Sequence, residues 1–306
     1  MIEVSCRLAG TDKRHIRETL VPVLAEVCAQ AGFDHEGATL LRYVGNAVFR
    51  LRADPVIIRI VLAPSLRHRV GKVVAVARWL AKDDVPAVRL LDGFEQPLRV
   101  GEHLATLWQN VPATGPPPTG VDLARLLRRF HELTPPSFEL PSWEPMTVVR
   151  GRLRDAQGID LADRAFLERR CGEIEVALHS LEYHLPPGPV HGDAYLGNLI
   201  PGPDGPVLCD FDSTCVGPRE WDLTPLAVGQ LRLGHPPEQY RSFAEQYGFD
   251  VTAWPGFSVL RQVRELKMVS GALPVLGGNP MVKAEFMRRI RSLRDGVDAA
   301  GWAPYR

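Results

Sequence analysis

The chain of 306 residues carries 36 Lys and Arg against 36 Asp and Glu, with 45% hydrophobic and 24% charged residues. This composition can build a core, which excludes a disordered chain, and the balanced charge gives no sign of the clustered basic face of a nucleic-acid-binding protein. No apolar run reaches the ~20 residues that span a bilayer, and residues 1–7 do not begin a secretory signal, so we expect a cytoplasmic protein with neither membrane nor nucleic-acid partners.

The cysteine pattern predicts the redox state of the chain. Five cysteines are present, an odd number without a Cys-x-x-Cys pair: Cys6, Cys28, Cys171, Cys209 and Cys215. We expect reduced, mostly buried thiols rather than a disulfide framework or a zinc site.

The first hundred residues mix helical and strand patterns. Apolar residues at helical spacing predict a helix over residues 14–31, which Gly32 ends. Three strand-like runs follow, at residues 38–44, 47–52 and 56–62. Gly45 and Asn46, between the first two runs, predict a tight hairpin. That hairpin is either an ordinary turn or a loop that donates backbone N–H groups to nucleotide phosphates.

Near residue 110 the sequence changes from strand-like to helical patterns, which marks a boundary between two lobes. Strand patterns at 87–91 and 104–108 end the first lobe. In the hinge that follows, backbone groups of Gln109 and Val111 could bind a purine edge. The predicted lobes are residues 1–110 and 111–306. Further helical patterns lie in the second lobe, at residues 121–133, 161–181, 239–247, 259–272 and 283–298.

The most informative stretch is His-Gly-Asp-Ala-Tyr-Leu-Gly-Asn, which runs from His191 to Asn198. The preceding loop predicts an irregular segment here rather than a helix. The Asp193 carboxylate could hold an attacking hydroxyl, while Asn198 and, twelve residues on, Asp210 offer hard oxygen ligands to Mg²⁺. Each of these residues alone would be an ordinary polar turn residue. Their joint order favours phosphoryl transfer from a magnesium nucleotide.

Asp210 and Asp212 follow a short apolar run, residues 207–209, that reads as a buried strand. Because side chains alternate along a strand, we expect both carboxylates on one face, where a single cation could contact both.

These motifs resemble those of the aminoglycoside phosphotransferase and choline kinase family, whose members are distant relatives of the protein kinases. The family patterns H-G-D-x4-N and I-D-x-[DE] correspond to residues 191–198 and 209–212, and G-x-x-x-[WY]-D-[LI] corresponds to 217–223. The resemblance implies a kinase-like two-lobed fold of mixed α and β structure. Its first lobe is an antiparallel sheet with helices, and its second lobe is larger and mainly helical.

The resemblance also implies roles for individual residues. Asp193 becomes the catalytic base, and Asn198 and Asp210 become Mg²⁺ ligands, with Asp212 as a further candidate ligand. Two more residues are expected to support the loop structurally, namely His191 and Asp222.

Arg59 interrupts an apolar strand, and a buried unpaired guanidinium costs several kcal/mol, so it should meet an anion unless it lies on a half-exposed edge. The family places there a cation that contacts nucleotide phosphates and pairs with a glutamate on the next helix. Here residues 67–81 contain no acid, and Val73 stands at the expected position. Either the nucleotide alone holds Arg59, or another acid reaches it, or the site is weakly active. We favour the first of these.

The sequence thus predicts a small-molecule kinase that uses Mg²⁺ and transfers the γ-phosphate of ATP or GTP to a hydroxyl of an aminoglycoside-like antibiotic or related metabolite. The alternatives are another acceptor (an amino alcohol, a sugar, a nucleoside or a peptide antibiotic) and a weakly catalytic nucleotide-binding regulatory protein. The candidate acceptor-binding residues are Glu265, Tyr195, Trp221, Glu144 and Asp155. No oligomeric state is predicted.

Overall fold

The computed structural model describes residues 3–4, 16–297 and 301–305; Cys6, the chain start and the first two residues of the predicted first helix lie outside these ranges. The chain forms two compact units. The first contains residues 1–117, 136–138 and 199–212, and the second contains 118–135, 139–198 and 213–306. Both units are discontinuous, since the chain leaves the second unit after Asn198 and re-enters it at Ser213. The lobes 1–110 and 111–306 remain a prediction.

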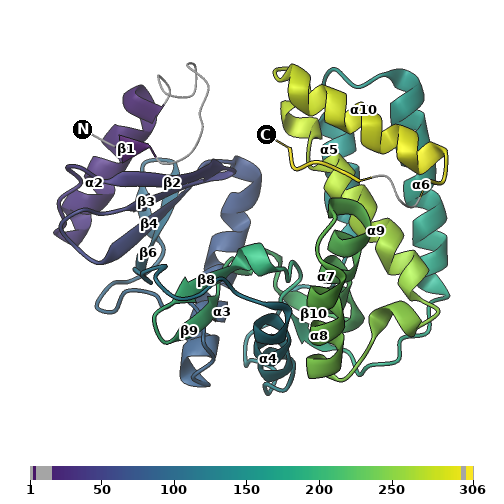
Figure 1. The fold of residues 1–306 in the computed structure, drawn as a ribbon. Coiled ribbons are helices and arrows are strands. Elements are labelled where there is room, and N and C mark those ends of the chain that lie inside the picture. The colour runs from purple at the N-terminus through teal and green to yellow at the C-terminus, as the bar shows by residue number, and fades with distance from the viewer. Residues whose placement is uncertain (1–2, 5–15, 298–300, 306) are drawn as a thin grey trace. The chain divides into compact units, whose positions relative to one another are not determined.

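A six-stranded sheet forms the centre of the first unit (Figure 1). In spatial order the strands are β1 (Glu3–Val4), β2 (Thr39–Val44), β3 (Asn46–Arg50), β4 (Val56–Val61), β6 (His103–Gln109) and β5 (Leu98–Val100). Neighbours from β2 to β5 in this order are antiparallel, and β1 pairs with β2 in parallel. The predicted hairpin is confirmed: β2 and β3 meet at Gly45, whose φ of 68° suits glycine.

The strand predicted at residues 87–91 is wrong. These residues make isolated bridges, Ala87 with Leu208 and Leu90 with Trp108. Their backbone groups bond to two different neighbours, because Val88 N–H donates to Leu208 O and Leu91 N–H donates to Leu107 O. The edge strand of this region is β5, whose three residues are too few to give a detectable period.

Two helices accompany this sheet, α2 (Val21–Ala31) and α3 (Val70–Lys82). A π-helical turn at 16–20 precedes α2, and Gly32 ends it with a φ of 75°. Helix α2 shares a buried core with alternate strand residues, among them Phe49, Ile58 and Ile60. Because side chains alternate along β4, Arg59 faces away from this core.

The second unit is mainly helical. Its helices are α4 (Gly120–His131), α5 (Pro145–Asp155), α6 (Leu161–His179), α7 (Glu220–Leu233), α8 (Pro237–Tyr247), α9 (Phe257–Ser270) and α10 (Pro280–Arg294). Two short strands, β7 (Gly188–Val190) and β10 (Cys215–Gly217), pair antiparallel. Within the ranges that the structure covers, no helix is long and apolar enough to cross a membrane.

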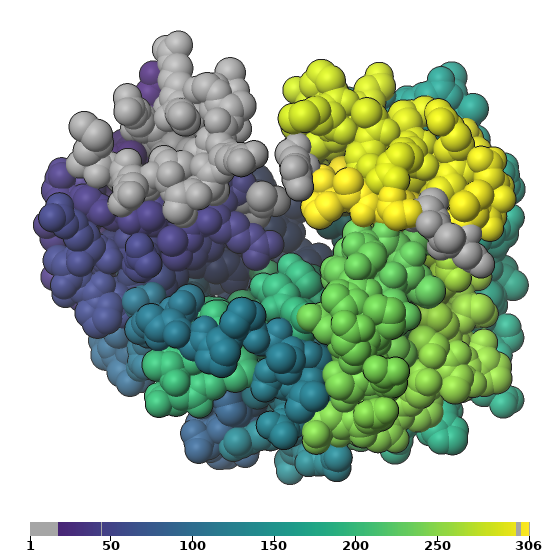
Figure 2. Space-filling model, in the orientation of Figure 1, coloured from purple at the N-terminus to yellow at the C-terminus, as the bar shows by residue number. Residues whose placement is uncertain are grey.

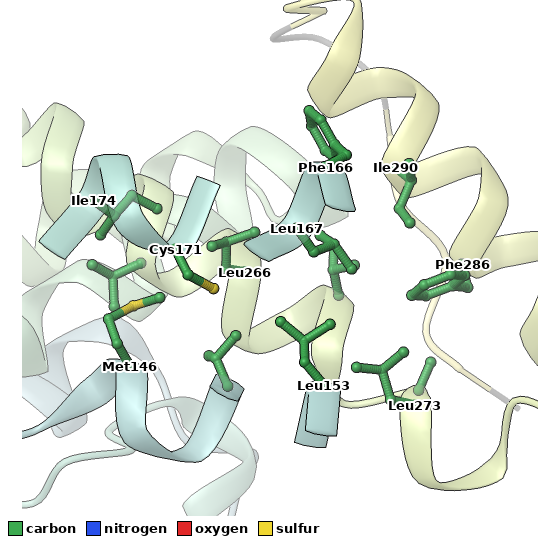
Figure 3. Close-up of a cluster of buried hydrophobic side chains, with 14 of the residues drawn as sticks. Met146, Leu153, Phe166, Leu167, Cys171, Ile174, Leu266, Leu273, Phe286 and Ile290 are labelled. Atoms are coloured by element: carbon green, nitrogen blue, oxygen red, sulfur yellow. The ribbon is translucent and has the colours of Figure 1, made fainter. Parts of the chain in front are cut away.

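Helix α9 lies at the centre of this unit and contacts α5, α6, α7 and α10. Leu266 of α9 packs with Leu153 of α5, Leu167 of α6 and Phe286 of α10 in one buried cluster (Figure 3). The C-terminal residues, yellow in Figure 2, lie against the green helices of the same unit, and Trp302 is buried there.

The described cysteines are thiols, as predicted. Burial raises the pKa of Cys28 and Cys171 to about 11 and that of Cys209 to about 12. Thiols with such high pKa values carry little thiolate at neutral pH and are poor nucleophiles.

Candidate active site

Asp222, in the first turn of α7, holds the loop from His191 to Asn198. Its carboxylate is fully buried and accepts hydrogen bonds from the backbone N–H groups of His191, at 2.6 Å, and Gly192, at 2.8 Å. The ring of His131 approaches the same carboxylate at 3.0 Å and contacts the Tyr247 hydroxyl at 2.8 Å with its other nitrogen. The loop is irregular up to a 3-10 turn at residues 196–198, as predicted.

Gly192 and Trp221 fix the loop from the other side. Gly192 has a φ of 83°, and a Cβ there would lie 2.1 Å from Ser213 O, so this position requires glycine. The indole of Trp221 is 1% exposed and donates to Gly192 O at 2.9 Å. Trp221, a candidate acceptor contact by sequence, is therefore placed as a buried support of the loop.

Asp193 lies in the middle of this loop. Its carboxylate accepts a hydrogen bond from Arg264 Nη1 at 2.5 Å, and its carbonyl accepts one from Asn198 Nδ2 at 2.8 Å. Although burial opposes ionisation, the nearby charges of Arg264 and Lys267 lower the pKa of Asp193 to about 2. The carboxylate is thus ionised and fixed in orientation.

In the first unit, the predicted strand placement of Asp210 and Asp212 is wrong. Strand β9 (Gly205–Leu208), which pairs with β8 (Leu199–Gly202), ends two residues before Asp210. Asp210 has a φ of 68°, and residues 211–213 form a 3-10 turn, so strand alternation does not govern these side chains. A left-handed aspartate is uncommon, and such backbone often occurs at functional sites.

Arg59 already has a carboxylate partner, contrary to our expectation that the nucleotide alone would hold it. It forms an ion pair with Asp212, in which the two side chains are 12% and 17% exposed. Lys72 of α3 donates to the Asp212 carbonyl at 2.7 Å. Helix α3, which was expected to supply a glutamate to Arg59, has Val73 at that position and Lys72 next to it. The acid that pairs with Arg59 is instead Asp212, which lies 153 positions further along the chain.

This ion pair changes the expected effect of Arg59→Ala in the nucleotide-free protein. Removing the guanidinium leaves the Asp212 carboxylate, in its mostly buried position, without its main counter-charge, which should cost about 1–3 kcal/mol of unfolding free energy. A fall in Tm of several degrees in calorimetry would show this, whereas the exposed Arg99→Ala on β5 should leave Tm unchanged. An unchanged Tm for Arg59→Ala would mean that the pair contributes nothing to the free fold.

The two carboxylates differ in protonation tendency because their neighbours differ. Burial and the adjacent Asp212 raise the pKa of Asp210, although Arg42 Nη1 lies 3.1 Å from its carboxylate. Burial also opposes the ionisation of Asp212, but Arg59 lowers its pKa. Carboxylate oxygens are hard ligands of the kind that Mg²⁺ prefers, and here each carboxylate already has an arginine as counter-charge.

A magnesium ion would need ligands beyond these carboxylates. Over the described ranges, no cluster of three or more His, Cys, Asp or Glu could hold a metal. The remaining ligands of such an ion would come from water and from nucleotide phosphates, as is common in phosphotransferases.

The predicted hinge has one backbone donor available. Gln109 N–H donates to Arg89 O at 2.9 Å, and Asn110 N–H donates to Pro55 O at 2.8 Å. Among described residues, the Val111 N–H donates to no backbone carbonyl. In the hairpin, Gly45 O accepts from two N–H groups, and the buried Asn46 Oδ1 has no hydrogen-bond partner in the described chain.

Two of the three carboxylates predicted to bind an acceptor, Glu265 and Glu144, have hydrogen-bond partners within the second unit. Glu265 is 3% exposed and accepts hydrogen bonds from Arg232 at 2.6 Å and Arg261 at 2.8 Å. Glu144 accepts from the Thr147 hydroxyl, and Asp155 is the exposed last residue of α5. Tyr195 is half-buried, and its ring lies against Gly197 of the same loop.

Sequence reasoning missed the basic residues that lie near Asp193, Asp210 and Asp212. Arg42, Lys72, Arg264 and Lys267 were not among the candidates. One signal was present: Arg261, Arg264 and Lys267 recur every three residues, the spacing of one helix face. Periodicity defines such a face but does not reveal what it contacts.

Comparisons with known proteins agree with this architecture. Residues 39–261 match the model of the phosphotransferase enzyme family. No curated protein matches the chain significantly.

Three solved structures share the fold, although identities of this size carry no information on substrate. An amicoumacin kinase in complex with AMP-PNP, Ca²⁺ and Ami has a TM-score of 0.73 and 14% identity, covering 96% of this chain and 98% of its own. A choline/ethanolamine kinase family protein from Mesorhizobium loti has a TM-score of 0.64 and 17% identity, covering 92% and 94%. A spectinomycin phosphotransferase in complex with ADP and spectinomycin has a TM-score of 0.61 and 15% identity, covering 91% and 94%. Because the family model spans most of the chain, the chain belongs to the phosphotransferase enzyme family and is a kinase that acts on hydroxyl acceptors.

Proposed function

We propose that the enzyme transfers the γ-phosphate of magnesium-bound ATP to a hydroxyl of a small molecule, with Asp193 as the catalytic base. The observation that carries this proposal is the ionised, hydrogen-bonded Asp193 carboxylate on a loop held by Asp222. The acceptor oxygen forms a bond to the γ-phosphorus, the bond from that phosphorus to the β–γ bridging oxygen breaks, and the hydroxyl proton passes to Asp193. ADP leaves with the electron pair of the broken bond.

The remaining sequence-predicted residues fit roles in nucleotide and metal binding. Asn198 and Asp210 would supply oxygen ligands to Mg²⁺, and Asp212 would contribute either as a ligand or through Arg59. The Val111 N–H would bind the purine edge, and the hairpin at Gly45 and Asn46 would cover the phosphates. The metal neutralises charge that develops on the phosphates during transfer.

We propose ATP rather than GTP as the phosphate donor and a cytoplasmic location, where ATP is abundant. AMP-PNP and ADP in two structural neighbours support the choice of ATP, whereas a third neighbour contains GDP, which keeps GTP as the alternative donor. The acceptors named for the neighbours include spectinomycin and, through the family name of another, choline or ethanolamine, so an antibiotic and an amino alcohol are both compatible with this fold. The regulatory alternative rested on a missing partner for Arg59, and Asp212 fills that position.

The test is phosphate incorporation from [γ-³²P]ATP and from [γ-³²P]GTP into a panel of hydroxylated antibiotics and metabolites, with Asp193→Asn as the blank. The proposal expects Mg²⁺-dependent transfer to at least one acceptor with the wild-type protein and about 10²–10⁴-fold slower transfer with the variant. Nucleotide binding without transfer to any acceptor would instead favour the regulatory alternative.

The Mg²⁺ ligands can be tested separately by the metal dependence of turnover. Asp210→Ala and Asn198→Ala should each raise the Mg²⁺ concentration for half-maximal turnover about tenfold or more, since each removes an oxygen ligand. Asp212→Ala should raise it less but lower Tm, because Asp212 is paired with Arg59. The exposed Asp204→Ala is the control. Equal Mg²⁺ shifts for Asp212→Ala and Asp210→Ala would overturn this ranking.

A further inference from the structure

Three basic side chains of the second unit lie beside the Asp193 carboxylate or beside each other. Arg264 and Lys267 are three residues apart and so project from one face of α9. Arg264 Nη1 lies 2.5 Å from Asp193 Oδ1. Arg152 of α5 reaches the same stretch of α9, where its Nη1 donates to Lys267 O at 3.4 Å and to Ser270 Oγ at 3.3 Å.

Burial and like charges disfavour the charged form of Lys267. Burial is the largest cause, the nearby Arg264 and Arg152 add to it, and Asp193 opposes them, so the pKa of Lys267 falls to about 8. An anion beside this ammonium would therefore stabilise its charged form.

Two nitrogens in this cluster lack a hydrogen-bond acceptor in the described chain. The Lys267 ammonium forms no ion pair with a described carboxylate and lies over the ring of Trp221, 5.0 Å from the ring centroid. Arg264 Nε is buried without a hydrogen-bond partner among the described residues. A ring face attracts a cation but does not satisfy the three donors of an ammonium group. Donors of this kind, beside a carboxylate that must hold a hydroxyl, suit a ligand with anionic oxygens.

We propose that the acceptor carries an anionic group, a carboxylate or a phosphate, close to the hydroxyl that is phosphorylated, and that Lys267 and Arg264 bind this group. The inference rests on the proposed kinase reaction with Asp193 as base. The anion would pair with Lys267 while its neighbouring hydroxyl donates to Asp193. Transfer then proceeds with the same bonds formed and broken as described above.

The same charges disfavour a polycationic acceptor. An ammonium group placed near Lys267 and Arg264 would meet like charges at short range, where each pair costs energy in a low-dielectric site. Glu265, the buried carboxylate predicted to contact an acceptor, is held by Arg232 and Arg261. A polycationic, aminoglycoside-like acceptor is therefore less favoured than an acceptor that carries an anionic group.

The experiment measures the ligand-induced change in Tm of the full chain saturated with AMP-PNP and Mg²⁺, which fills the nucleotide site. Four hexoses that differ in charge serve as probes: glucuronate, glucose 6-phosphate, glucose and glucosamine. The variants are Lys267→Met and, as a matched control, Lys283→Met at an exposed position on α10. Removing the Lys267 ammonium should itself raise Tm below pH 8, because its charged form is disfavoured in the fold, so only shifts caused by the probe are compared.

At about ten times their Kd, the anionic probes should raise the wild-type Tm by roughly 2–5 °C, and glucose and glucosamine should not. Lys267→Met should weaken anion binding about tenfold or more, and Lys283→Met should leave it unchanged. Stabilisation by glucuronate assigns a carboxylate, and stabilisation by glucose 6-phosphate alone assigns a phosphate. No shift with either anion, equal shifts with all four probes, or an intact shift in Lys267→Met would overturn the proposal.

Two further outcomes separate this inference from the proposed function. If Lys267→Met weakens AMP-PNP binding and leaves the probes unaffected, the cation serves the nucleotide and the inference is wrong while the kinase assignment stands. If anions bind as expected but no acceptor is phosphorylated in the transfer assay, the anion site stands and the kinase assignment fails.

Discussion

Asp193→Asn should lower kcat by about 10²–10⁴-fold and leave nucleotide affinity nearly unchanged. The amide keeps the size of the carboxylate and can still accept a hydrogen bond from Arg264, but it cannot take the hydroxyl proton, and a positioned base contributes a factor of this size. Single-turnover phosphate transfer would measure the rate, and calorimetric titration with AMP-PNP would measure the affinity.

Asp193→Asn also removes the counter-charge of Arg264 and Lys267, so a modest fall in Tm is expected alongside the loss of rate. Asp204→Asn, the same substitution at an exposed turn, should change neither quantity. A rate for Asp193→Asn within a few-fold of wild type would show that another group accepts the proton. A loss of AMP-PNP affinity in proportion to the rate would show instead that Asp193 acts in nucleotide binding.

The fold could be predicted where elements are long and locally patterned. The hairpin at Gly45 and the helix α9 both follow from apolar period and turn residues. The region 87–91 was wrongly predicted as a strand. Its apolar residues fit a strand pattern, but its backbone N–H groups bond to two different neighbours, Leu208 and Leu107. The spacing of apolar residues also does not show that residues 199–212 belong to the first unit.

The candidate site could be predicted where its residues belong to short sequence motifs. The loop containing Asp193 and its support by Asp222 have a motif, whereas Arg59 and Asp212 are 153 positions apart and Arg264 and Asp193 are 71 apart. Such pairings depend on how elements distant in sequence pack together, and the local spacing of apolar residues carries no information about that packing. The backbone conformation of Asp210 was missed because strand alternation was extended two residues past the end of β9.

Asp222→Ala should abolish detectable turnover and destabilise the protein, which distinguishes it from Asp193→Asn. Its carboxylate accepts two backbone N–H groups of the catalytic loop and contacts His131, and all of these lie in a fully buried position. Each of the two buried backbone donors left without a partner costs about 1–3 kcal/mol, so a total loss of about 2–6 kcal/mol in unfolding free energy is expected.

The matched control for Asp222 is Asp250→Ala, because Asp250 accepts the Thr252 N–H at 2.9 Å and the Tyr240 hydroxyl at 2.5 Å in the same unit but away from the loop. Asp250→Ala should lower stability and leave kcat unchanged. Asp222→Asn should fall between wild type and Asp222→Ala, since one amide oxygen can accept a loop N–H while the amide NH₂ faces the other donor. Urea unfolding and transfer kinetics measured on the same preparations would check this. If Asp222→Ala loses stability yet retains the wild-type rate, the catalytic loop does not depend on Asp222 for its active conformation, because the loop N–H groups then find other partners.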